Sequence, residues 1–462
     1  MTFAQLGIST SIIQSLEENR ISVPTDIQTK TIPAILKNET DLIGIAQTGT
    51  GKTAAFCLPI LQSIDPKNTE IQALVLVPTR ELGQQVAREF FLFSKHMPRI
   101  FTECVYGGVP VAEHIQRLKR STHVLVATPG RLLDLLANRA VNLNNLQFVV
   151  LDEADEMVNM GFKTDIDQIL QQCNNKSTKL LFTATMPADV KHIIDEFIRK
   201  DAIEVRINAN ERVNAQIEHK YIVYKQGEKL DYLKAFLHEH VQERGILFCR
   251  TKTAAKRLAK QLVGFEVTAD ALHGNLNQEM RDKVMRGLRK GRINLLIATD
   301  IAARGIDIKE LDYIIHYHLP EKTEHYTHRS GRTARAGNNG ISVCLVRTED
   351  ISELKIIENE LKISFDEIEV SLLHEVKHTH PVTVQINLGL SQGFTKASLT
   401  DFLVEETGIS QGDVKNLNVR DNSAQFEISA RYEQQLVLNL KGFKIAHRNV
   451  KLSIAQAQHK FI

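Results

Sequence analysis

The sequence predicts an α/β protein with two tandem doubly wound parallel-sheet domains, followed by a small C-terminal α+β domain. Short apolar runs alternate with amphipathic helical patterns over most of the 462 residues, which is typical of parallel sheets covered by helices. From about residue 380 onward the segments follow the order βαββαβ, which is typical of a small split-βαβ domain. We therefore expect domains at residues 1–207, 215–365 and 380–462.

Composition limits the class of protein. A chain of this length should hold about three domains, and 43% hydrophobic with 24% charged residues indicates a globular protein with large cores. The net charge of +2 permits nucleic-acid binding without demonstrating it. The five cysteines have no CxxC spacing, which argues against zinc and disulfides and fits a reducing cytoplasm. We expect no signal peptide, no membrane span and no membrane partner.

Apolar runs mark the strands of the first two domains. The first domain has strand-like runs at Leu42–Ile45, Ala73–Val77, Val124–Ala127, Phe148–Leu151 and Leu180–Thr183. A polar stretch, Asn208–Asn214, predicts a hinge. The second domain has strand-like runs at Gly245–Cys249, Leu295–Thr299, Tyr313–His316 and Ile341–Val346, then a helical run at Ile351–Leu361 and a connector at about 366–380.

The C-terminal segment changes character. Its expected strands are Val382–Leu390, Val414–Val419, Ala424–Ala430 and Asn449–Ile454. Its expected helices are Lys396–Thr407 and Glu433–Leu440.

A glycine-rich loop follows the first strand and has the character of a phosphate-binding loop. It consists of Ala46, Gln47, Thr48, Gly49, Thr50, Gly51, Lys52 and Thr53. Glycines let the backbone approach phosphate oxygens, Lys52 would reach the β- and γ-phosphates, and Thr53 would offer its hydroxyl to Mg²⁺. Ala46 stands where the strict GxxxxGK[ST] pattern has glycine, so a chance glycine-rich turn is the alternative. The position directly after a strand favours a nucleotide site.

Two acids, Asp152 and Glu153, directly follow the buried run Phe148–Leu151. Asp152 is placed to hold Mg²⁺, directly or through water, and Glu153 to orient or deprotonate the attacking water. A solvated run of negative charge is the alternative, but such a run has no reason to follow four apolar residues. Asp155 needs a partner, and hydroxyls are available at the end of the next strand, on Thr183 and Thr185.

In their order and spacing, these motifs resemble the DEAD-box family of ATP-dependent RNA helicases over almost the whole chain. Asp152–Asp155 spells the family's name motif, and Ala46–Thr53 matches the family's own phosphate loop. The resemblance implies two RecA-like domains that bind ATP and Mg²⁺. It also implies nucleotide contacts from Phe3 and Gln28 to adenine, from Asp307 to ribose, and from the arginine fingers Arg332 and Arg335 to the phosphates.

The same resemblance implies an RNA site and a coupling set. The RNA contacts would be made by Arg80, Gly108, Thr128, Arg131, Thr299 and Arg304, with Gly107 and Gly130 letting the strand come close. Hydrolysis would be coupled to unwinding through Asp155, Thr183, Thr185, Gln278, Arg281 and His328. These RNA-contact side chains suit phosphate and 2′-OH oxygens, so the core should not select sequence.

Two positions depart from the family pattern. Arg20 and Ile21 stand where the adenine motif usually has glycine and an aromatic residue, so stacking on the base should be weaker. Thr183 replaces the more usual serine and keeps the hydroxyl. The arginine fingers lie on the second domain, so hydrolysis requires the domains to close; if their segment is helical, Arg332 and Arg335 share one face.

The C-terminal domain resembles an RNA-recognition fold without its aromatic platform, because its third strand has one phenylalanine and no basic-glycine start. It looks like the appended domain of the DbpA-like subfamily, which recognises a hairpin of 23S ribosomal RNA. Candidate RNA contacts are Lys396, Lys415, Arg420, Arg431, Lys441, Lys444, Arg448 and Lys451. A solvated basic face, or a dimerisation module, is the alternative.

The sequence therefore predicts an ATP-dependent RNA helicase that separates short duplexes near a ribosomal RNA hairpin. Its expected partner is the pre-ribosomal large subunit, and its expected location is the cytoplasm. Two other functions stay open: an ATP-gated RNA clamp or chaperone without ribosomal specificity, and a translocase on double-stranded DNA. Intact Glu153, Arg332 and Arg335 favour turnover over a static clamp.

Overall fold

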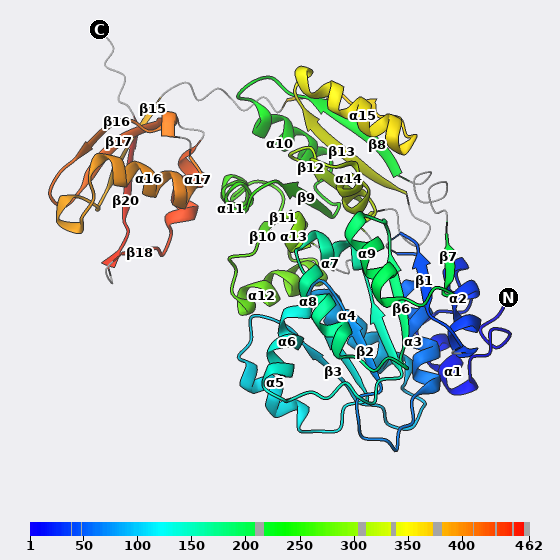
Figure 1. Cartoon of the computed structure of the whole chain (residues 1–462). Coiled ribbons are helices and arrows are strands. Elements are labelled where there is room, and N and C mark those ends of the chain that lie inside the picture. Colours follow the sequence, from blue (N-terminus) through cyan, green and yellow to red (C-terminus); the bar gives the residue numbers. More distant parts are fainter. Residues whose placement is uncertain are drawn as a thin grey trace, which may run out of the picture. The chain divides into compact units, whose positions relative to one another are not determined.

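The computed structural model describes residues 1–37, 39–47, 49–207, 217–303, 311–333, 339–372, 381–409, 411–429, 432–445 and 448–456 (Figure 1). The chain divides into two compact units. One contains the first parallel sheet, and the other contains the second parallel sheet and the C-terminal sheet. The predicted hinge Asn208–Asn214 lies outside the described residues. Among the helices that the structure describes, none has the length and apolar character needed to cross a membrane.

The first sheet has seven parallel strands in the order β3-β4-β2-β5-β6-β1-β7. The strands are β1 (Leu42–Ile45), β2 (Ala73–Leu76), β3 (Thr102–Val105), β4 (Val124–Ala127), β5 (Phe148–Leu151), β6 (Thr178–Thr183) and β7 (Ile203–Arg206). The helices are α1 (Thr10–Glu18), α2 (Asp26–Lys37), α3 (Lys52–Ser63), α4 (Arg80–Phe93), α5 (Val111–Leu118), α6 (Pro129–Ala137), α7 (Ala154–Asn159), α8 (Lys163–Gln172) and α9 (Ala188–Phe197).

Both faces of this sheet are buried. Along β2, Val75 belongs to the apolar cluster shared with α1 to α4, while Leu74 and Leu76 belong to the cluster shared with α6 to α9. Successive side chains of a strand point to opposite faces, so helices must cover both. This explains why the five predicted strands of this domain read as continuous apolar runs.

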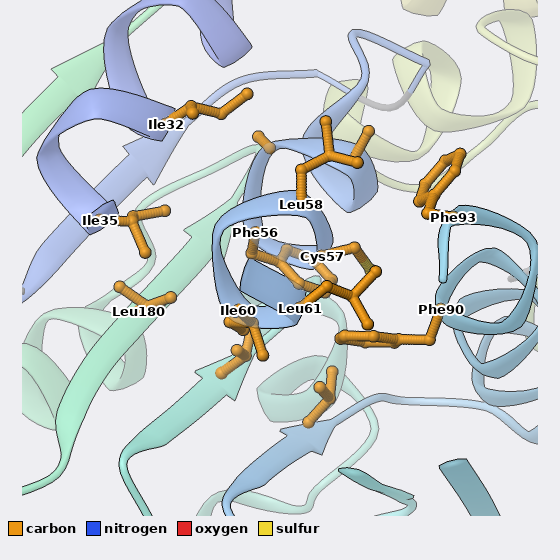
Figure 2. Close-up of a cluster of buried hydrophobic side chains, with 14 of the residues drawn as sticks. Ile32, Ile35, Phe56, Cys57, Leu58, Ile60, Leu61, Phe90, Phe93 and Leu180 are labelled. Carbon is orange, nitrogen blue, oxygen red and sulfur yellow. The ribbon is translucent and has the colours of Figure 1, made fainter. Parts of the chain in front are cut away.

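Helix α3, which begins at the phosphate loop, lies in the middle of one of these clusters (Figure 2). Its side chains Phe56, Leu58 and Leu61 are fully buried. The ring of Phe56 lies 5.4 Å from that of Phe182 on β6 and 6.5 Å from that of Phe90 on α4. Packing on every side therefore fixes the first turn of α3 against the edge of the sheet.

The second sheet is also parallel and has the order β10-β11-β9-β12-β13-β8-β14. Its strands are β8 (Ile217–Val223), β9 (Gly245–Cys249), β10 (Ala269–Leu272), β11 (Leu295–Thr299), β12 (Tyr313–His316), β13 (Gly340–Val346) and β14 (Asp366–Glu367). Its helices are α10 (Lys229–Glu239), α11 (Lys252–Gln261), α12 (Gln278–Arg289), α13 (Asp300–Ala303), α14 (Thr323–Ser330) and α15 (Ile351–Leu361). The start of the expected connector, Asp366–Glu367, is thus an edge strand.

The C-terminal domain is a four-stranded antiparallel sheet in the order β16-β17-β15-β20. Its main elements are β15 (Pro381–Ile386), α16 (Lys396–Thr407), β16 (Lys415–Val419), β17 (Ala424–Ser429), α17 (Glu433–Leu440) and β20 (Leu452–Gln456). A short ribbon pairs β18 (Lys444–Ile445) with β19 (Arg448–Asn449). The predicted fold class, two parallel-sheet domains and a small α+β domain, is confirmed.

Two predicted strands of this domain were wrong in their limits. The strand predicted at Val382–Leu390 ends at Ile386, because the backbone N–H groups of Leu390 and Ser391 bond the loop carbonyls of Arg420 and Asp421. The strand predicted at Asn449–Ile454 is two elements, because Asn449 pairs back with Lys444 before β20 begins. Local hydrogen bonding that the alternation of residues does not reveal decided both cases.

The close approach of β9 and β12 predicts a measurable packing constraint. Gly245 pairs with Tyr313, whose ring lies where a Cβ on residue 245 would stand. We expect Gly245→Ala to destabilise the second domain by about 1–3 kcal/mol through overpacking, measured as a lowered thermal transition of the full chain. Gly274→Ala is the control, because nothing lies within 4 Å of a Cβ there; equal transitions for the two variants would contradict the packing argument.

Candidate nucleotide and RNA site

Three neighbouring strands of the first sheet bring the predicted nucleotide residues to one edge. β6 lies between β5 and β1, and all three run parallel. The phosphate loop follows β1, Asp152 and Glu153 follow β5, and Thr185 follows β6. Because the carboxyl ends of parallel strands share an edge, these groups converge where ligands bind in such sheets.

The phosphate loop depends on two left-handed glycines. Gly49 has φ 83° and Gly51, the N-cap of α3, has φ 89°. Lys52 is 6% exposed, and its Nζ donates to the carbonyl oxygen of Ala46 at 2.9 Å, which folds the side chain back over the loop. Free N–H groups at a helix start suit an anion. Thr48 lies outside the described residues.

The side-chain amide of Gln28 hydrogen-bonds the backbone of this loop at Gly51. Its Oε1 accepts from the N–H of Thr25 at 3.0 Å, and its Nε2 donates to the carbonyl of Gly51 at 3.0 Å. A Cβ on Gly51 would collide with the Gln28 amide, so this close approach requires glycine. An amide nitrogen has two hydrogens and an amide oxygen two lone pairs, so Gln28 keeps capacity for a base edge.

Of the other residues of the adenine motif, Phe3 and Ile21 contact the apolar core, and Arg20 is exposed to solvent. Phe3 is 3% exposed and lies in the apolar cluster of the first domain. Ile21 packs against the same cluster, while Arg20 is exposed and has φ 60°. A left-handed φ favours glycine, so the structure gives a backbone reason for the glycine expected there and a strain of about 1 kcal/mol for arginine.

Asp152 has the surroundings of a cation ligand. It is 2% exposed, and its Oδ1 has no hydrogen-bond partner among the described residues. Burial raises its pKa to about 7; Lys52 works against this rise, and Glu153 adds to it. A buried carboxylate oxygen without a partner, beside a phosphate loop and the hydroxyl-bearing Thr53, fits Mg²⁺ shared with a nucleotide.

Glu153 and Asp155 are held differently. Glu153 is buried and adopts φ 53°, a left-handed conformation that is rare for a non-glycine residue and recurs at functional sites. Asp155 Oδ2 accepts from the N–H of Thr185 at 2.9 Å and from its hydroxyl at 2.8 Å. The hydroxyl of Thr183 donates to the carbonyl of Thr185 at 2.6 Å, so the acid motif and the end of β6 form one network.

In the second domain, Arg329 ties three strand ends together. Its guanidinium, 4% exposed, pairs with Asp300 after β11 at 2.5 and 2.7 Å. It also donates to the carbonyl of His318 after β12 at 2.9 Å and lies over the ring of Phe248 on β9 at 5.2 Å. Arg329 is therefore a buried residue that holds the ends of these strands together, and it is not part of a solvent-exposed turn.

The structure describes some of the other predicted site residues of this domain and leaves others outside the described residues. Arg332 follows α14, which ends at Ser330, so the helical face expected for the arginine fingers does not reach it. Arg281 on α12 donates to the carbonyl of Ala302 at 3.4 Å. Thr299 ends β11 and His328 lies in α14. Arg304, Asp307 and Arg335 lie outside the described residues, and Gln278 is described in its backbone alone.

Sequence reasoning missed a buried polar network formed by side chains of β8, β12, β13 and α14. His316 Nε2 lies 3.0 Å from the hydroxyl of Ser342, which lies 2.8 Å from that of Ser330. Tyr326 donates to Ser342 at 3.1 Å, and its hydroxyl lies 2.6 Å from His219 Nδ1. A histidine within the apolar run Tyr313–His316 was the available signal.

The expected RNA contacts of the first domain cluster at the ends of β2, β3 and β4. Gly107 and Gly108 are exposed, and no atom lies within 4 Å of a Cβ on either. Arg80 begins α4 with its guanidinium 4.1 Å from the ring of Tyr106, and Thr128 is the N-cap of α6. Arg131 differs from the others because it is 8% exposed.

The C-terminal sheet has an apolar face and a polar face. The single phenylalanine of the predicted third strand, Phe426, is fully buried in the core. The opposite face carries Thr383, Gln385, Gln425, Glu427 and Ser453. Six of the candidate basic residues are exposed, namely Lys396, Lys415, Arg420, Lys441, Lys444 and Lys451. Arg431 lies outside the described residues, and Arg448 is described in its backbone alone.

A phosphate loop, a buried carboxylate two strands away and a second parallel-sheet domain define a phosphate-loop nucleotide hydrolase. Comparison with known families agrees and narrows the class. Residues 25–193 match the DEAD/DEAH box helicase family, 228–337 the helicase conserved C-terminal domain, and 383–454 the DbpA RNA binding domain.

Individual relatives point the same way. DEAD-box ATP-dependent RNA helicase CshA of Bacillus cereus is 39% identical over 81% of this chain and 71% of its own length. RhpA of Helicobacter pylori is 38% identical over 83% and 78%. The solved structure of S. cerevisiae Dbp5 bound to RNA and ADP BeF3 has a TM-score of 0.73 at 27% identity and covers 79% of this chain and 95% of its own. The chain belongs to the DEAD-box family of ATP-dependent RNA helicases, and it carries an RNA-binding C-terminal domain.

The burial of Asp152 predicts a pH-dependent cost in the nucleotide-free protein. Its pKa rises from an ordinary 3.8 to about 7, so the carboxyl favours the folded state while protonated, and this contribution is lost as pH rises through about 7. We expect Asp152→Asn to be more stable than the parent by about 1–3 kcal/mol above pH 7, with the gap closing toward acid pH. Thermal unfolding with chelator from pH 5.5 to 8.5 measures it; a gap independent of pH would contradict the assignment.

Proposed function

We propose that this helicase opens short RNA duplexes close to a hairpin of 23S ribosomal RNA during assembly of the large ribosomal subunit. The match of residues 383–454 to the DbpA RNA binding domain carries this proposal. A polar sheet face and exposed basic side chains suit RNA recognition without base stacking on the sheet. The pre-ribosomal large subunit is then the partner, and the cytoplasm is the location.

In the proposed mechanism, the first domain holds the nucleotide and prepares water. The N–H groups at the start of α3 and the ammonium of Lys52 bind phosphate oxygens, and Thr53 and Asp152 would hold Mg²⁺, which would supply positive charge beside the transferred phosphoryl group. Glu153 orients or deprotonates the attacking water. Gln28 selects the adenine edge and stiffens the loop through Gly51.

The second domain completes the reaction. Arg332 and Arg335 act as arginine fingers, which are worth about 10³ to 10⁵ in rate in comparable enzymes. Arg329, which pairs with Asp300, fixes the end of α14 just before Arg332. Hydrolysis therefore requires closure of the domains, and RNA bound across them favours closure. The Asp155–Thr185 network links the acid motif to the end of β6 and couples the two events.

The C-terminal domain directs the helicase core to a particular RNA site. A core that contacts phosphate and ribose cannot select sequence, whereas a domain tethered to one hairpin raises the local concentration of the core near adjacent helices. The same core would otherwise act on any exposed RNA.

The role of Glu153 is tested by hydrolysis. Glu153→Gln should lower RNA-stimulated phosphate release by about 10²- to 10⁴-fold, because it removes the base, while ATP binding persists. Glu196→Gln, an exposed acid on α9, is the control. If RNA does not stimulate the parent enzyme, the helicase mechanism fails in favour of a clamp; equal stimulation by matched DNA would favour a DNA translocase.

The role of the tail is tested by deletion. Removing residues 380–462 should weaken binding to a 23S hairpin fragment by about 10²-fold, because the tether is lost, and leave ATPase stimulation by generic RNA in place. A hairpin of equal length and scrambled sequence is the control in the same anisotropy assay. Unchanged affinity for the 23S hairpin would refute the targeting role.

A further inference from the structure

Arg131 is buried and engaged on every side. Its Nε donates to Asp134 at 3.3 Å, and its Nη2 donates to the carbonyl of Val109 at 2.8 Å. Its Nη1 lies 2.6 Å from Nδ1 of His114 on α5. A guanidinium that is 8% exposed and bonded through all three nitrogens has little left for an RNA phosphate.

His114 is the acceptor that completes this arrangement. An arginine can only donate, so Nδ1 of His114 accepts, and the ring is the neutral tautomer with hydrogen on Nε2. The ring is fully buried, and burial lowers its pKa to about 4, with the positive charges of Arg131, Arg117 and Arg80 acting in the same direction. His114 therefore remains an acceptor at neutral pH.

The pair connects three segments that carry the expected RNA contacts. Val109, whose carbonyl Arg131 binds, directly follows the exposed Gly107–Gly108 turn. The rings of His114 and Tyr106 form a T-shaped pair with centroids 5.3 Å apart, and the guanidinium of Arg80 lies over the same tyrosine ring at 4.1 Å. Arg131 itself lies in α6, which begins after Thr128.

We propose that His114 and Arg131 are positioning residues for the RNA-binding edge of the first domain, and that Arg131 does not itself contact RNA. The inference rests on the proposed RNA-contacting role of this edge. His114 holds Arg131, Arg131 holds the carbonyl after the glycine turn, and Tyr106 carries the restraint to Arg80. Loss of the acceptor leaves a buried guanidinium partly unpaired, so these segments lose their common support.

Variants of two buried histidines, His114 and His123, distinguish a role in positioning the RNA-binding edge from a role in packing the core alone. His123 is also buried at 1% exposure, and its Nδ1 accepts from the N–H of Phe101 at 2.9 Å. It precedes β4, at the strand end opposite Thr128. His114→Ala should raise the Kd for single-stranded RNA by about tenfold with the KM for ATP unchanged, whereas His123→Ala should leave RNA affinity as in the parent. His114→Gln, whose amide oxygen can accept from Arg131, should stay within about twofold of the parent.

Salt dependence provides a second measurement, on Arg131→Gln, which removes the positive charge of the side chain. A residue that contacts a phosphate contributes about 0.7 to the slope of log affinity against log salt for single strands. Weakened RNA affinity with an unchanged slope supports the positioning role. A slope reduced by about 0.7 would overturn it, as would equal RNA affinity of His114→Ala and the parent. Failure of the proposed function is a different result: the parent enzyme would then neither bind RNA nor be stimulated by it, whatever residue stands at position 114.

Discussion

The adjacency of β5, β6 and β1 in a parallel sheet is the constraint on which the catalytic arrangement depends. It brings Lys52 and Asp152 to one edge although they are far apart in sequence, and it places Thr185 after β6, the strand between those two. The edge holds only if α3 cannot shift. The apolar contacts of Phe56 with Phe90 and Phe182 prevent that movement, so the chemistry at the helix start depends on packing one turn further on.

Each parallel-sheet domain has a buried arginine that hydrogen-bonds several segments at the ends of its strands. Arg131 has a histidine nitrogen, a backbone carbonyl and a carboxylate as acceptors. Arg329 has the carboxylate of Asp300 and the carbonyl of His318, and its Nη1 lies 3.4 Å from Nδ1 of His316. A guanidinium offers five donors in a fixed plane, so it can bridge loops that share no backbone hydrogen bonds. Neutral histidine suits this use because burial beside a positive charge keeps it unprotonated.

The strands that are buried on both faces could be predicted from the sequence, as could the helices Ile351–Leu361, Lys396–Thr407 and Glu433–Leu440. Val124–Ala127 and Phe148–Leu151 are continuous apolar runs, and they were predicted to the residue. The edge strands Thr102–Val105 and Ile203–Arg206 were missed, because polar residues interrupt their apolar pattern. Edge strands are specified by their neighbours in the sheet, which no local pattern records.

The candidate site divides in the same way. Asp152 directly follows β5, and Lys52 lies in the loop that follows β1, so both could be placed from their order along the chain. The burial of Arg131 could not, because it depends on His114 and Val109 from other segments. The position of Arg332 beyond α14 depends likewise on where the helix ends. Motifs indicate which residues gather, but only the packing decides which of them face a ligand.

Unfavourable local features are concentrated where the nucleotide is expected. Glu153 is held in a left-handed conformation, and Asp152 is a buried carboxyl whose charged form is disfavoured. Each costs stability, and the apolar clusters on the two faces of the sheet offset that cost. A cation and phosphates would relieve the electrostatic part, because they provide Asp152 and Lys52 with opposite charges. They would not relieve the backbone strain of Glu153, because that strain does not depend on charge. The first domain therefore gives up stability for a site arranged before its ligand binds.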